Sequence, residues 1–176
     1  MRKDRIVIVE YDPVWPQMFT EQAHRLHTVL SPWLVRPVEH IGSTSIPGLP
    51  AKPIIDMLAL IDDYDGFADA LPRAESIGWK AAPEPGDREG RQQSLCFPSV
   101  ELRSHHLHVV EARSGHWKEW LMFRDHLRAH PDLAAQYARL KTGLAAEDDT
   151  DRARYRSAKA PFIRSVLADI TSPPNA

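Results

Sequence analysis

A short apolar run with one charged side chain, residues 53–61 (PIIDMLALI), constrains the fold more than any other part of the sequence. Near-continuous apolar strands are typical of sheets that are covered on both faces, so we expect a central buried strand here. A carboxylate inside such a strand destabilises the fold unless it binds a metal or accepts hydrogen bonds. The charged residue of the run, Asp56, is therefore the first candidate for a functional site.

The spacing of apolar residues predicts an α+β fold. Strands and helices are mixed in the first part of the chain, and only helices are expected after residue 115. We expect residues 1–112 to form an α/β core and residues 113–176 to form helices that pack on this core within the same globular unit. Strands are expected at 6–9, 37–41, 53–61, 79–82, 94–100 and 105–111, and helices at 12–30, 63–76, 117–130, 131–144 and 148–170.

Composition and charge argue against several classes of protein. The chain has 176 residues and a formal net charge of −2, whereas binding of duplex nucleic acid by bulk charge needs a basic surface. Its single cysteine, Cys96, excludes an internal disulfide framework and a cysteine-based zinc site. No apolar run approaches the ~18 residues of a membrane span, and residues 1–5 precede no apolar signal-peptide core. We therefore expect a cytoplasmic protein with no membrane partner.

The segment before the apolar run has a pattern typical of anion-binding loops. A predicted strand ends at Gly42, Ser43 and Thr44, and Asp56 follows about a dozen residues later in the next strand. Small residues after a strand allow backbone N–H groups to approach a phosphate closely. We expect Gly42, Ser43 and Thr44 to bind phosphate groups and Asp56 to hold a metal ion beside them. This is the arrangement that phosphoryl or nucleotidyl transfer requires.

The predicted strand at residues 105–109 (HHLHV) offers further metal ligands. Side chains alternate along a strand, so His106 and His108 share one face and His105 lies on the other. Imidazole is a common ligand of transition metals and a poor ligand of magnesium. We expect Mg²⁺ or Mn²⁺, with Zn²⁺ as a further candidate, at Asp56, His106 and His108, and His108 is also a candidate catalytic base. The alternative is that these histidines are hydrogen-bonded structural residues.

Three lysines are candidates to offset phosphate charge. Lys52 lies in the loop before the Asp56 strand, and Lys141 and Lys159 fall on the apolar stripes of two predicted helices. The functional interpretation is that these helices present cations to a triphosphate or an acidic substrate. The alternatives are that Lys141 and Lys159 extend their ammonium groups to solvent and that Lys52 bonds a loop carbonyl. Arg124 and Asp125 are expected instead to form a structural ion pair that ties a C-terminal helix to the sheet.

Together these segments resemble the GrpB family, a group of proteins with the nucleotidyltransferase fold. The resemblance runs along nearly the whole chain and implies a mixed sheet with flanking helices, with a nucleotidyltransferase-like core over residues 1–112. It also implies an NTP as substrate with an unknown small acceptor. It includes domains fused to dephospho-CoA kinase, which suits a role linked to coenzyme A metabolism. The matching blocks are YDPxW at 11–15, HIGSTSIPGL at 40–49, KPIID at 52–56, HHLHV at 105–109, FRDHLR at 123–128, YxxLK at 137–141 and YxxxK at 155–159.

The chain departs from the nucleotidyltransferase pattern at one position. The superfamily signature has a second acidic residue two positions after the first, and this position is Leu58 here. A two-metal site needs more than one strand carboxylate. Two hypotheses follow. The chain is a metal-dependent nucleotidyltransferase that moves a nucleotidyl group from an NTP to a small acceptor, or it is a catalytically degenerate module that binds a nucleotide or a phosphorylated metabolite.

Overall fold

The computed structural model describes residues 5–172. Residues 1–4, on which the expectation about a signal peptide rests, lie outside this part of the chain. None of the helices within it has both the length and the apolar character that crossing a bilayer requires. The strands are β1 (Glu39–Ile41), β2 (Ile55–Ile61), β3 (Lys80–Ala81), β4 (Gln92–Phe97) and β5 (His105–Glu111), and the helices are α1 (Trp15–Leu30), α2 (Leu71–Ser76), α3 (Trp117–Ala129), α4 (Pro131–Glu147) and α5 (Arg152–Thr171).

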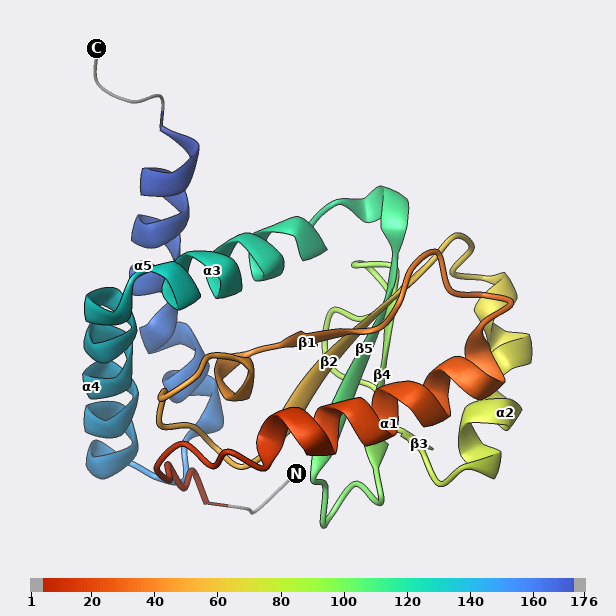
Figure 1. Cartoon of the computed structure of the whole chain (residues 1–176), viewed down its shortest axis with the longest axis horizontal. Helices are drawn as coiled ribbons and strands as arrows, with labels where there is room; N and C mark the ends of the chain where they lie inside the picture. Colours follow the sequence, from red (N-terminus) through yellow and green to blue (C-terminus); the bar gives the residue numbers. More distant parts are fainter. Residues whose placement is uncertain (1–4, 173–176) are drawn as a thin grey trace.

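The strands form one mixed sheet in the order β1-β2-β5-β4-β3 (Figure 1). β2 and β5 run parallel, whereas the other neighbouring strands are antiparallel. The register of the parallel pair places Asp56 beside His106 and Leu58 beside His108. A mixed sheet with helices packed around it confirms the predicted α+β class.

Helices cover both faces of β2, as its apolar composition predicts (Figure 1). On one face, Met57 and Ala59 belong to the main hydrophobic core, which includes residues of α1 and α2. On the other face, Leu58 and Leu60 pack with α3. Every residue of β2 except Asp56 is buried, so this carboxylate is the point where the strand opens to a polar environment.

The C-terminal helices pack on one another and on the loop between β1 and β2. Leu127 of α3 and Tyr137 of α4 share a hydrophobic cluster with Ile46 and Leu49 of that loop, and Phe162 of α5 packs against it. Figure 1 shows α4 and α5 beside each other at one end of the sheet. These contacts bring α5 close to the loops that precede β2. A boundary at residue 112 stays a prediction.

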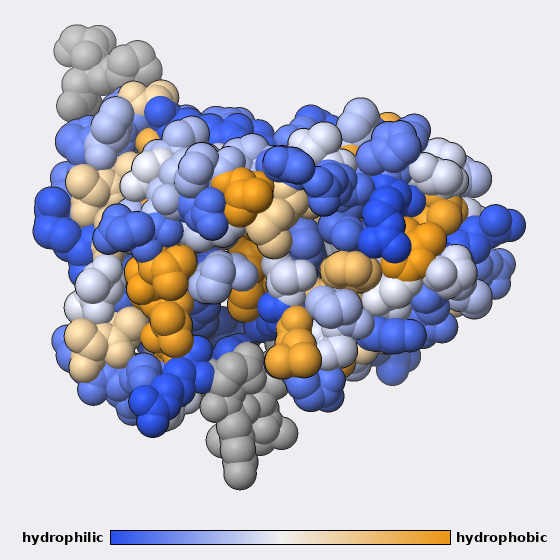
Figure 2. Space-filling view, turned by 60° about the horizontal axis from the view of Figure 1, so that its bottom comes forward, coloured by the Kyte–Doolittle hydropathy of each residue, from blue (hydrophilic) through white to orange (hydrophobic). Residues whose placement is uncertain are grey.

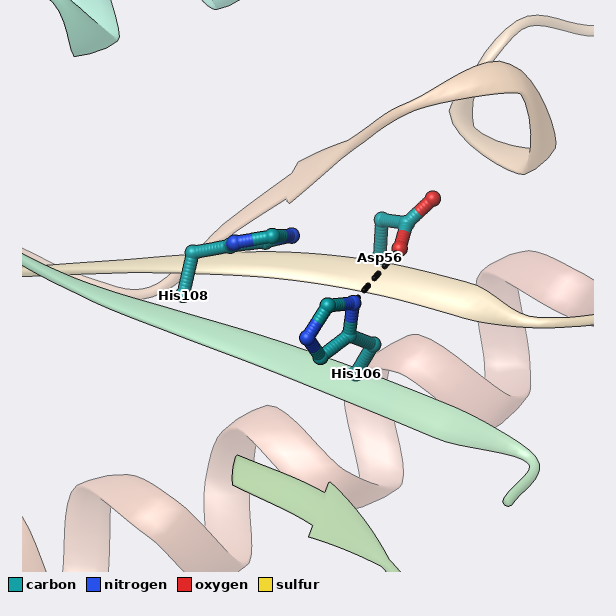
Figure 3. Close-up of side chains that lie close together, drawn as sticks. All are labelled: Asp56, His106 and His108. Atoms are coloured by element: carbon teal, nitrogen blue, oxygen red, sulfur yellow. Dashed lines mark ion pairs between the residues drawn. The ribbon is translucent and has the colours of Figure 1, made fainter. Parts of the chain in front are cut away.

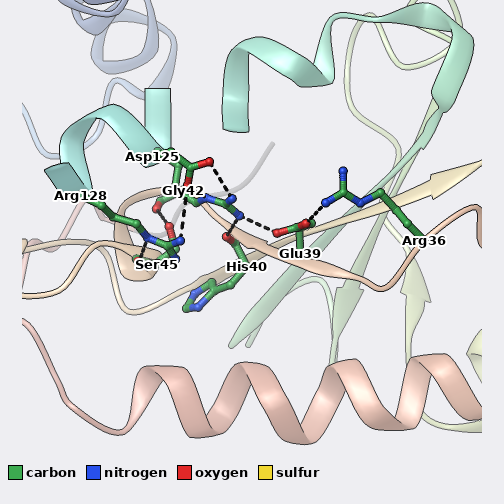
Figure 4. Close-up of polar contacts among 8 residues, drawn as sticks. Arg36, Glu39, His40, Gly42, Ser45, Asp125 and Arg128 are labelled. Carbon is green, nitrogen blue, oxygen red and sulfur yellow. Dashed lines mark hydrogen bonds and ion pairs between the residues drawn. The ribbon is translucent and has the colours of Figure 1, made fainter. Parts of the chain in front are cut away.

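A buried arginine ties α3 to β1. The guanidinium of Arg124 donates to the carboxylate of Glu39 and to a backbone carbonyl of the same strand, and it also pairs with Asp125. Arg128, on the next turn of α3, donates to the carbonyl of Ser45 in the turn after β1 (Figure 4). The predicted pair of Arg124 and Asp125 is thus confirmed, and Glu39 connects it to the sheet. We call Arg124, Arg128 and their acceptors the α3 anchor.

The strand predicted at residues 6–9 is wrong. Among the described residues, only Val9 of this segment pairs, in one antiparallel bridge with Ala51 in which each backbone N–H donates to the other carbonyl. The next hydrogen-bonded pair in such a ladder would join Val7 to Pro53. Proline has no N–H to donate, so the ladder ends after one pair.

The helix predicted at residues 63–76 is divided. A 3₁₀ turn covers Gly66–Ala70, and α2 begins at Leu71 with Pro72 in its first turn. Proline cannot donate to the preceding turn, but it is well accommodated at the start of a helix. The apolar spacing therefore marked a helical segment correctly and missed the break that the proline imposes.

Candidate functional site

A cleft of about 1150 Å³ lies beside the first residues of β2 and β5. It is bordered by the turn after β1, by the loop that follows β3 and by the first half of α5. In the space-filling view the surface is largely hydrophilic, with hydrophobic side chains in small separate groups and a hollow among them (Figure 2). The cleft brings together all but one of the predicted site residues: Ser43, Thr44, Lys52, Asp56, His106, His108, Lys141 and Lys159.

Asp56, His106 and His108 form a compact cluster on one face of the sheet (Figure 3). One potential ligand atom of each residue lies within 4.8 Å of those of the other two. His106 Nδ1 is 3.6 Å from Asp56 Oδ1, and the two imidazole rings have centroids 4.2 Å apart. The parallel register explains the arrangement, because it sets Asp56 and His106 side by side and strand alternation adds His108. His105 faces the opposite side, where its Nε2 lies 3.2 Å from the carbonyl of Met18.

The charges of the cluster favour an ionised carboxylate beside a neutral imidazole. Burial raises the pKa of the Asp56 carboxyl, but the polar contact with His106 and the positive charge of nearby groups, among them Arg103, outweigh this effect and hold the pKa below its ordinary value. The Asp56 side chain is still 36% exposed, because it faces the cleft. Burial, together with the charge of His106, lowers the pKa of His108 to about 4. His108 is therefore neutral at pH 7, the form that binds a metal.

These residues fit a metal ion of the transition series. His108 Nδ1 is buried and has no hydrogen-bond partner among the described residues, which is costly for an imidazole nitrogen without another contact. One carboxylate and two imidazoles form a donor set suited to Mn²⁺ or Zn²⁺, whereas Mg²⁺ prefers oxygen ligands. The cluster could hold such an ion through Asp56, His106 and His108, with its other positions open to the cleft.

Gly42 supports this cluster from behind and does not line the cleft. Its backbone has φ 69° and ψ −174°, a conformation that is essentially restricted to glycine. A Cβ atom at this position would lie 2.5 Å from Asp56 Oδ2 and 2.9 Å from Asp56 Cβ. Glycine is therefore required here for two reasons: the backbone conformation of the turn, and the close approach of the Asp56 side chain. Its role in phosphate binding stays a prediction.

The turn after β1 presents Ser43 and Thr44 differently. Ser43 lines the cleft, whereas Thr44 is 1% exposed although it borders the same space. The Thr44 hydroxyl lies 3.0 Å from His40 Nε2 and 3.4 Å from the carbonyl of Ile54. This hydroxyl therefore joins the turn to β1 and to the start of β2. A phosphate contact by Thr44 stays a prediction.

The three lysines reach the cleft from three different segments, and burial lowers the pKa of each. Lys141 of α4 is 2% exposed, its Nζ donates to the carbonyl of Pro50 at 2.6 Å, and its pKa is lowered to about 7. Lys52 and Lys159 lie against the same ring, with Nζ atoms 4.7 and 4.5 Å from the centroid of Tyr155. Within residues 5–172, no carboxylate forms an ion pair with any of these lysines. The cleft therefore collects positive charge for which residues 5–172 provide no carboxylate partner.

Sequence analysis missed five charged residues that line the same cleft: Glu84, Arg103, Asp151, Arg152 and Arg156. Glu84, in the loop after β3, lies between Arg103, just before β5, and Arg156 of α5. Its Oε1 is also 3.9 Å from His106 Nε2. Glu84 and Arg103 lie in loops, which have no periodicity, and Arg156 is a helix residue outside the apolar stripe, so the sequence pattern gave no indication that these three side chains meet. The position of Arg103 directly before the histidine strand was the one available signal.

Comparison with known proteins identifies relatives along most of the chain. A family model described as GrpB protein matches residues 5–169. The chain is 36% identical over 173 residues to the UPF0157 protein PA4798 of Pseudomonas aeruginosa, covering 93% of this chain and 67% of that protein. The crystal structure of conserved protein GrpB from Enterococcus faecalis has a TM-score of 0.78 and 30% sequence identity, and the similarity covers 93% of this chain and 96% of that one.

A further relative is the dephospho-CoA kinase of Mycolicibacterium paratuberculosis. The two sequences are 28% identical over 181 residues, which represent 90% of this chain and 44% of that enzyme. This chain thus corresponds to less than half of the kinase. The match to the family model, which covers nearly all described residues, shows that the chain belongs to the GrpB family.

Proposed function

We propose that this chain binds a nucleoside triphosphate together with a divalent metal ion and transfers the nucleotidyl group to a small acceptor. One observation carries the proposal. Three lysines that have no carboxylate partner among the described residues converge on the cleft that holds Asp56, His106 and His108. A triphosphate has the multiple negative charges and the acceptor oxygens that would satisfy these lysines. Its metal-bound form would also use the adjacent donor cluster.

The donor cluster has a defined part in this proposal. Asp56, His106 and His108 would hold the metal ion at the sheet. When bound, the ion supplies charge stabilisation at phosphate oxygens and makes a coordinated hydroxyl group more acidic. Gly42 keeps the Asp56 carboxylate in place, since its backbone passes directly behind that side chain.

The proposed reaction is a substitution at the α-phosphorus. The acceptor hydroxyl oxygen forms a bond to this phosphorus, the bond to the bridging oxygen of the β-phosphate breaks, and pyrophosphate leaves with the bonding electrons. The hydroxyl proton passes to solvent or to a side-chain base. Lys52 and Lys159 would offset the charge that develops on the leaving pyrophosphate, and Ser43 would orient a phosphate oxygen from the turn.

His108 fits the role of ligand better than that of base. A pKa of about 4 keeps its imidazole neutral at pH 7, but the same value makes it a weak proton acceptor at that pH. Its Nδ1 is buried and has no hydrogen-bond partner within the described chain, so a contact at that atom would replace a missing interaction. We therefore assign His108 to metal binding in the proposal.

A second function, binding without catalysis, is favoured by the surroundings of Leu58. This residue is fully buried in an apolar cluster under α3, at the position where the superfamily has its second acid. In this alternative the cleft recognises a nucleotide or a phosphorylated metabolite. Similarity to a dephospho-CoA kinase makes a phosphorylated precursor of coenzyme A the first metabolite to test.

Calorimetric titration tests the binding part of the proposal. ATP and a non-hydrolysable ATP analogue would be titrated with and without Mn²⁺ into the wild-type chain, into Lys52→Gln and into Lys118→Gln. Lys118 is the matched control, because it is an exposed lysine of α3 outside the cleft. We expect Mn²⁺-dependent binding that weakens by about tenfold in Lys52→Gln, since one charge-assisted contact of ~1.4 kcal/mol is lost, and that does not change in Lys118→Gln.

A second assay separates the two functions. Release of pyrophosphate from NTP in the presence of candidate hydroxyl acceptors would establish transfer, whereas tight binding without release would favour the binding module. Equal nucleotide affinity in Lys52→Gln and Lys118→Gln would contradict both functions at this cleft. Other bases are tested in the same way with GTP, CTP and UTP.

A further inference from the structure

Glu84 lies between the candidate metal ligands and two arginines that line the cleft. Its Oε2 is 3.2 Å from Arg156 Nη1, and its Oε1 is 3.7 Å from Arg103 Nη1. The same Oε1 lies 3.9 Å from His106 Nε2. One carboxylate thus faces α5, the segment before β5 and the histidine of the cluster.

The imidazole of His106 has two different nitrogen environments. Nδ1 faces Asp56 at 3.6 Å, on the side of the candidate metal ligands. Nε2 faces Glu84, is buried, and has no hydrogen-bond partner within the described residues. A buried imidazole nitrogen without a hydrogen-bond partner destabilises the fold. If Glu84 Oε1 lay about 1 Å closer, it would be within hydrogen-bond distance of this nitrogen.

A second carboxylate, that of Asp87, holds the backbone of Glu84 in place. Its N–H donates to Asp87 Oδ2 at 2.8 Å. Asp87 Oδ1 accepts from Gln92 and Ser94 of β4, which fixes the loop to the sheet. The Glu84 side chain is 25% exposed at the cleft, so the fixed loop presents its carboxylate beside His106.

We infer that Glu84 is a positioning residue that orients His106 for metal binding. The inference rests on the metal binding proposed above. If His106 binds the ion through Nδ1, its Nε2 carries the proton and donates it to Glu84 Oε1. A carboxylate that accepts from the far nitrogen of a metal-bound histidine fixes the tautomer and the ring orientation and makes the ligand more basic. Glu84 also contacts Arg103 and Arg156. The same carboxylate would therefore connect metal binding to two arginines of the cleft that could contact phosphate.

The test measures the metal affinity of the full chain, without any assay of activity. Mn²⁺ and Zn²⁺ would be titrated into the wild type, Glu84→Gln, Glu84→Asp and Glu89→Gln. Glu89 is the matched control, since it is an exposed glutamate of the same loop. We expect Glu84→Gln to weaken Mn²⁺ binding by about 10- to 100-fold, Glu84→Asp to weaken it less, and Glu89→Gln to leave it unchanged. Glu84→Asp keeps the charge, so it separates the contact to His106 from simple attraction of a cation.

A spectroscopic signature distinguishes positioning from a purely structural role. In the Zn²⁺-loaded wild type, the imidazole NMR spectrum should show His106 protonated at Nε2, with a low-field N–H proton that exchanges slowly. This proton should exchange rapidly in Glu84→Gln, while the thermal midpoint of the metal-free variant stays close to that of the wild type. The wild-type spectrum is informative even if a variant fails to fold.

The measurements separate a failure of the role of Glu84 from a failure of the proposed metal centre. Metal affinity in Glu84→Gln equal to that of the wild type, or His106 bound through Nε2, would overturn the role of Glu84 and leave the metal centre intact. A wild-type chain that binds neither Mn²⁺ nor Zn²⁺ would overturn the proposed metal centre, and the role of Glu84 with it.

Discussion

The buried cations of the α3 anchor and those of the cleft differ in their partners. Arg124 is 8% exposed and contacts the carboxylates of Glu39 and Asp125. Lys141 is 2% exposed, and the acceptor of its ammonium group is the carbonyl of Pro50. Burial lowers the pKa of both groups, but the two carboxylates raise that of Arg124 above its ordinary value. The buried charge of Arg124 is thus paired with carboxylates, whereas within the described residues that of Lys141 is not.

This difference separates a structural role from a binding role. A paired buried charge stabilises the fold in which it lies, and removal of one partner leaves the other with its desolvation cost. A buried cation without a carboxylate destabilises the fold until an anion arrives. The anchor should therefore respond to substitution through stability, and the cleft through ligand affinity.

Gly42→Ala should damage both regions at once. The new Cβ would meet the Asp56 carboxylate in a conformation that alanine avoids, so we expect a loss of about 4 kcal/mol from strain and collision together. Gly48→Ala is the matched control, because Gly48 also has positive φ (75°) but its Cβ would have no atom within 4 Å. Urea unfolding measures both variants. Equal losses would mean that the contact with Asp56 has no energetic weight.

Arg124→Leu should weaken the fold by about 3 kcal/mol, because the carboxylate of Glu39 and a buried carbonyl lose their donor. Arg139→Leu, at an exposed position of α4, should change stability by less than about 0.5 kcal/mol. The folded fraction of Arg124→Leu should keep its affinity for ATP with Mn²⁺. If Arg124→Leu were as stable as the wild type, the α3 anchor would not stabilise the fold.

Asp56→Asn should reduce Mn²⁺ affinity at least about 100-fold, equivalent to ~2.7 kcal/mol, since a carboxylate ligand becomes a neutral amide. Stability without metal should change by less than about 1 kcal/mol, because within residues 5–172 no backbone N–H donates to this carboxylate. Calorimetry and urea unfolding measure the two effects, with Asp169→Asn on the exposed face of α5 as control. A clear fall in the urea midpoint with an unchanged m-value would instead indicate a structural role for Asp56.

Lys141→Met should remove a pH dependence of stability. The folded-state pKa of Lys141 is about 7, below its ordinary value of 10.5, so between these values the unfolded chain binds more protons. Wild-type stability should therefore rise with pH in this window, and the destabilisation by Lys141 is fully present below pH 7. Between pH 7 and pH 9 we expect the wild type to gain of order 1 kcal/mol relative to Lys141→Met. Lys118→Met should follow the wild type, and parallel curves for all three would show that Lys141 stays protonated when buried.

The regular elements of the site could be predicted from periodicity. Alternation along a strand predicted that His106 and His108 share a face, and the structure sets both beside Asp56. The helical stripes predicted that Lys141 and Lys159 point inward, and both line the cleft. These inferences need only the repeat of a strand or a helix, which is local in the sequence.

The remaining features depend on contacts between distant segments. Glu84 meets Arg103 and Arg156, which come from other parts of the chain, and no repeat connects a loop residue to them. The strand predicted at residues 6–9 had a suitable composition, but its partner segment contains Pro53. Local pattern describes what a segment can form, and the partner decides whether it forms.

The register of β2 and β5 also defines a route for change. Asp56, His106 and His108 occupy three corners of a rectangle on the sheet, and Leu58 occupies the fourth. A single exchange, Leu58→Asp, would place a second carboxylate at that corner, two residues after Asp56. The obstacle to a carboxylate at this corner is its apolar packing. Leu58 belongs to a buried cluster against which Trp117 and Trp120 of α3 pack. An acidic side chain at position 58 would therefore require a change in the α3 residues that cover this corner.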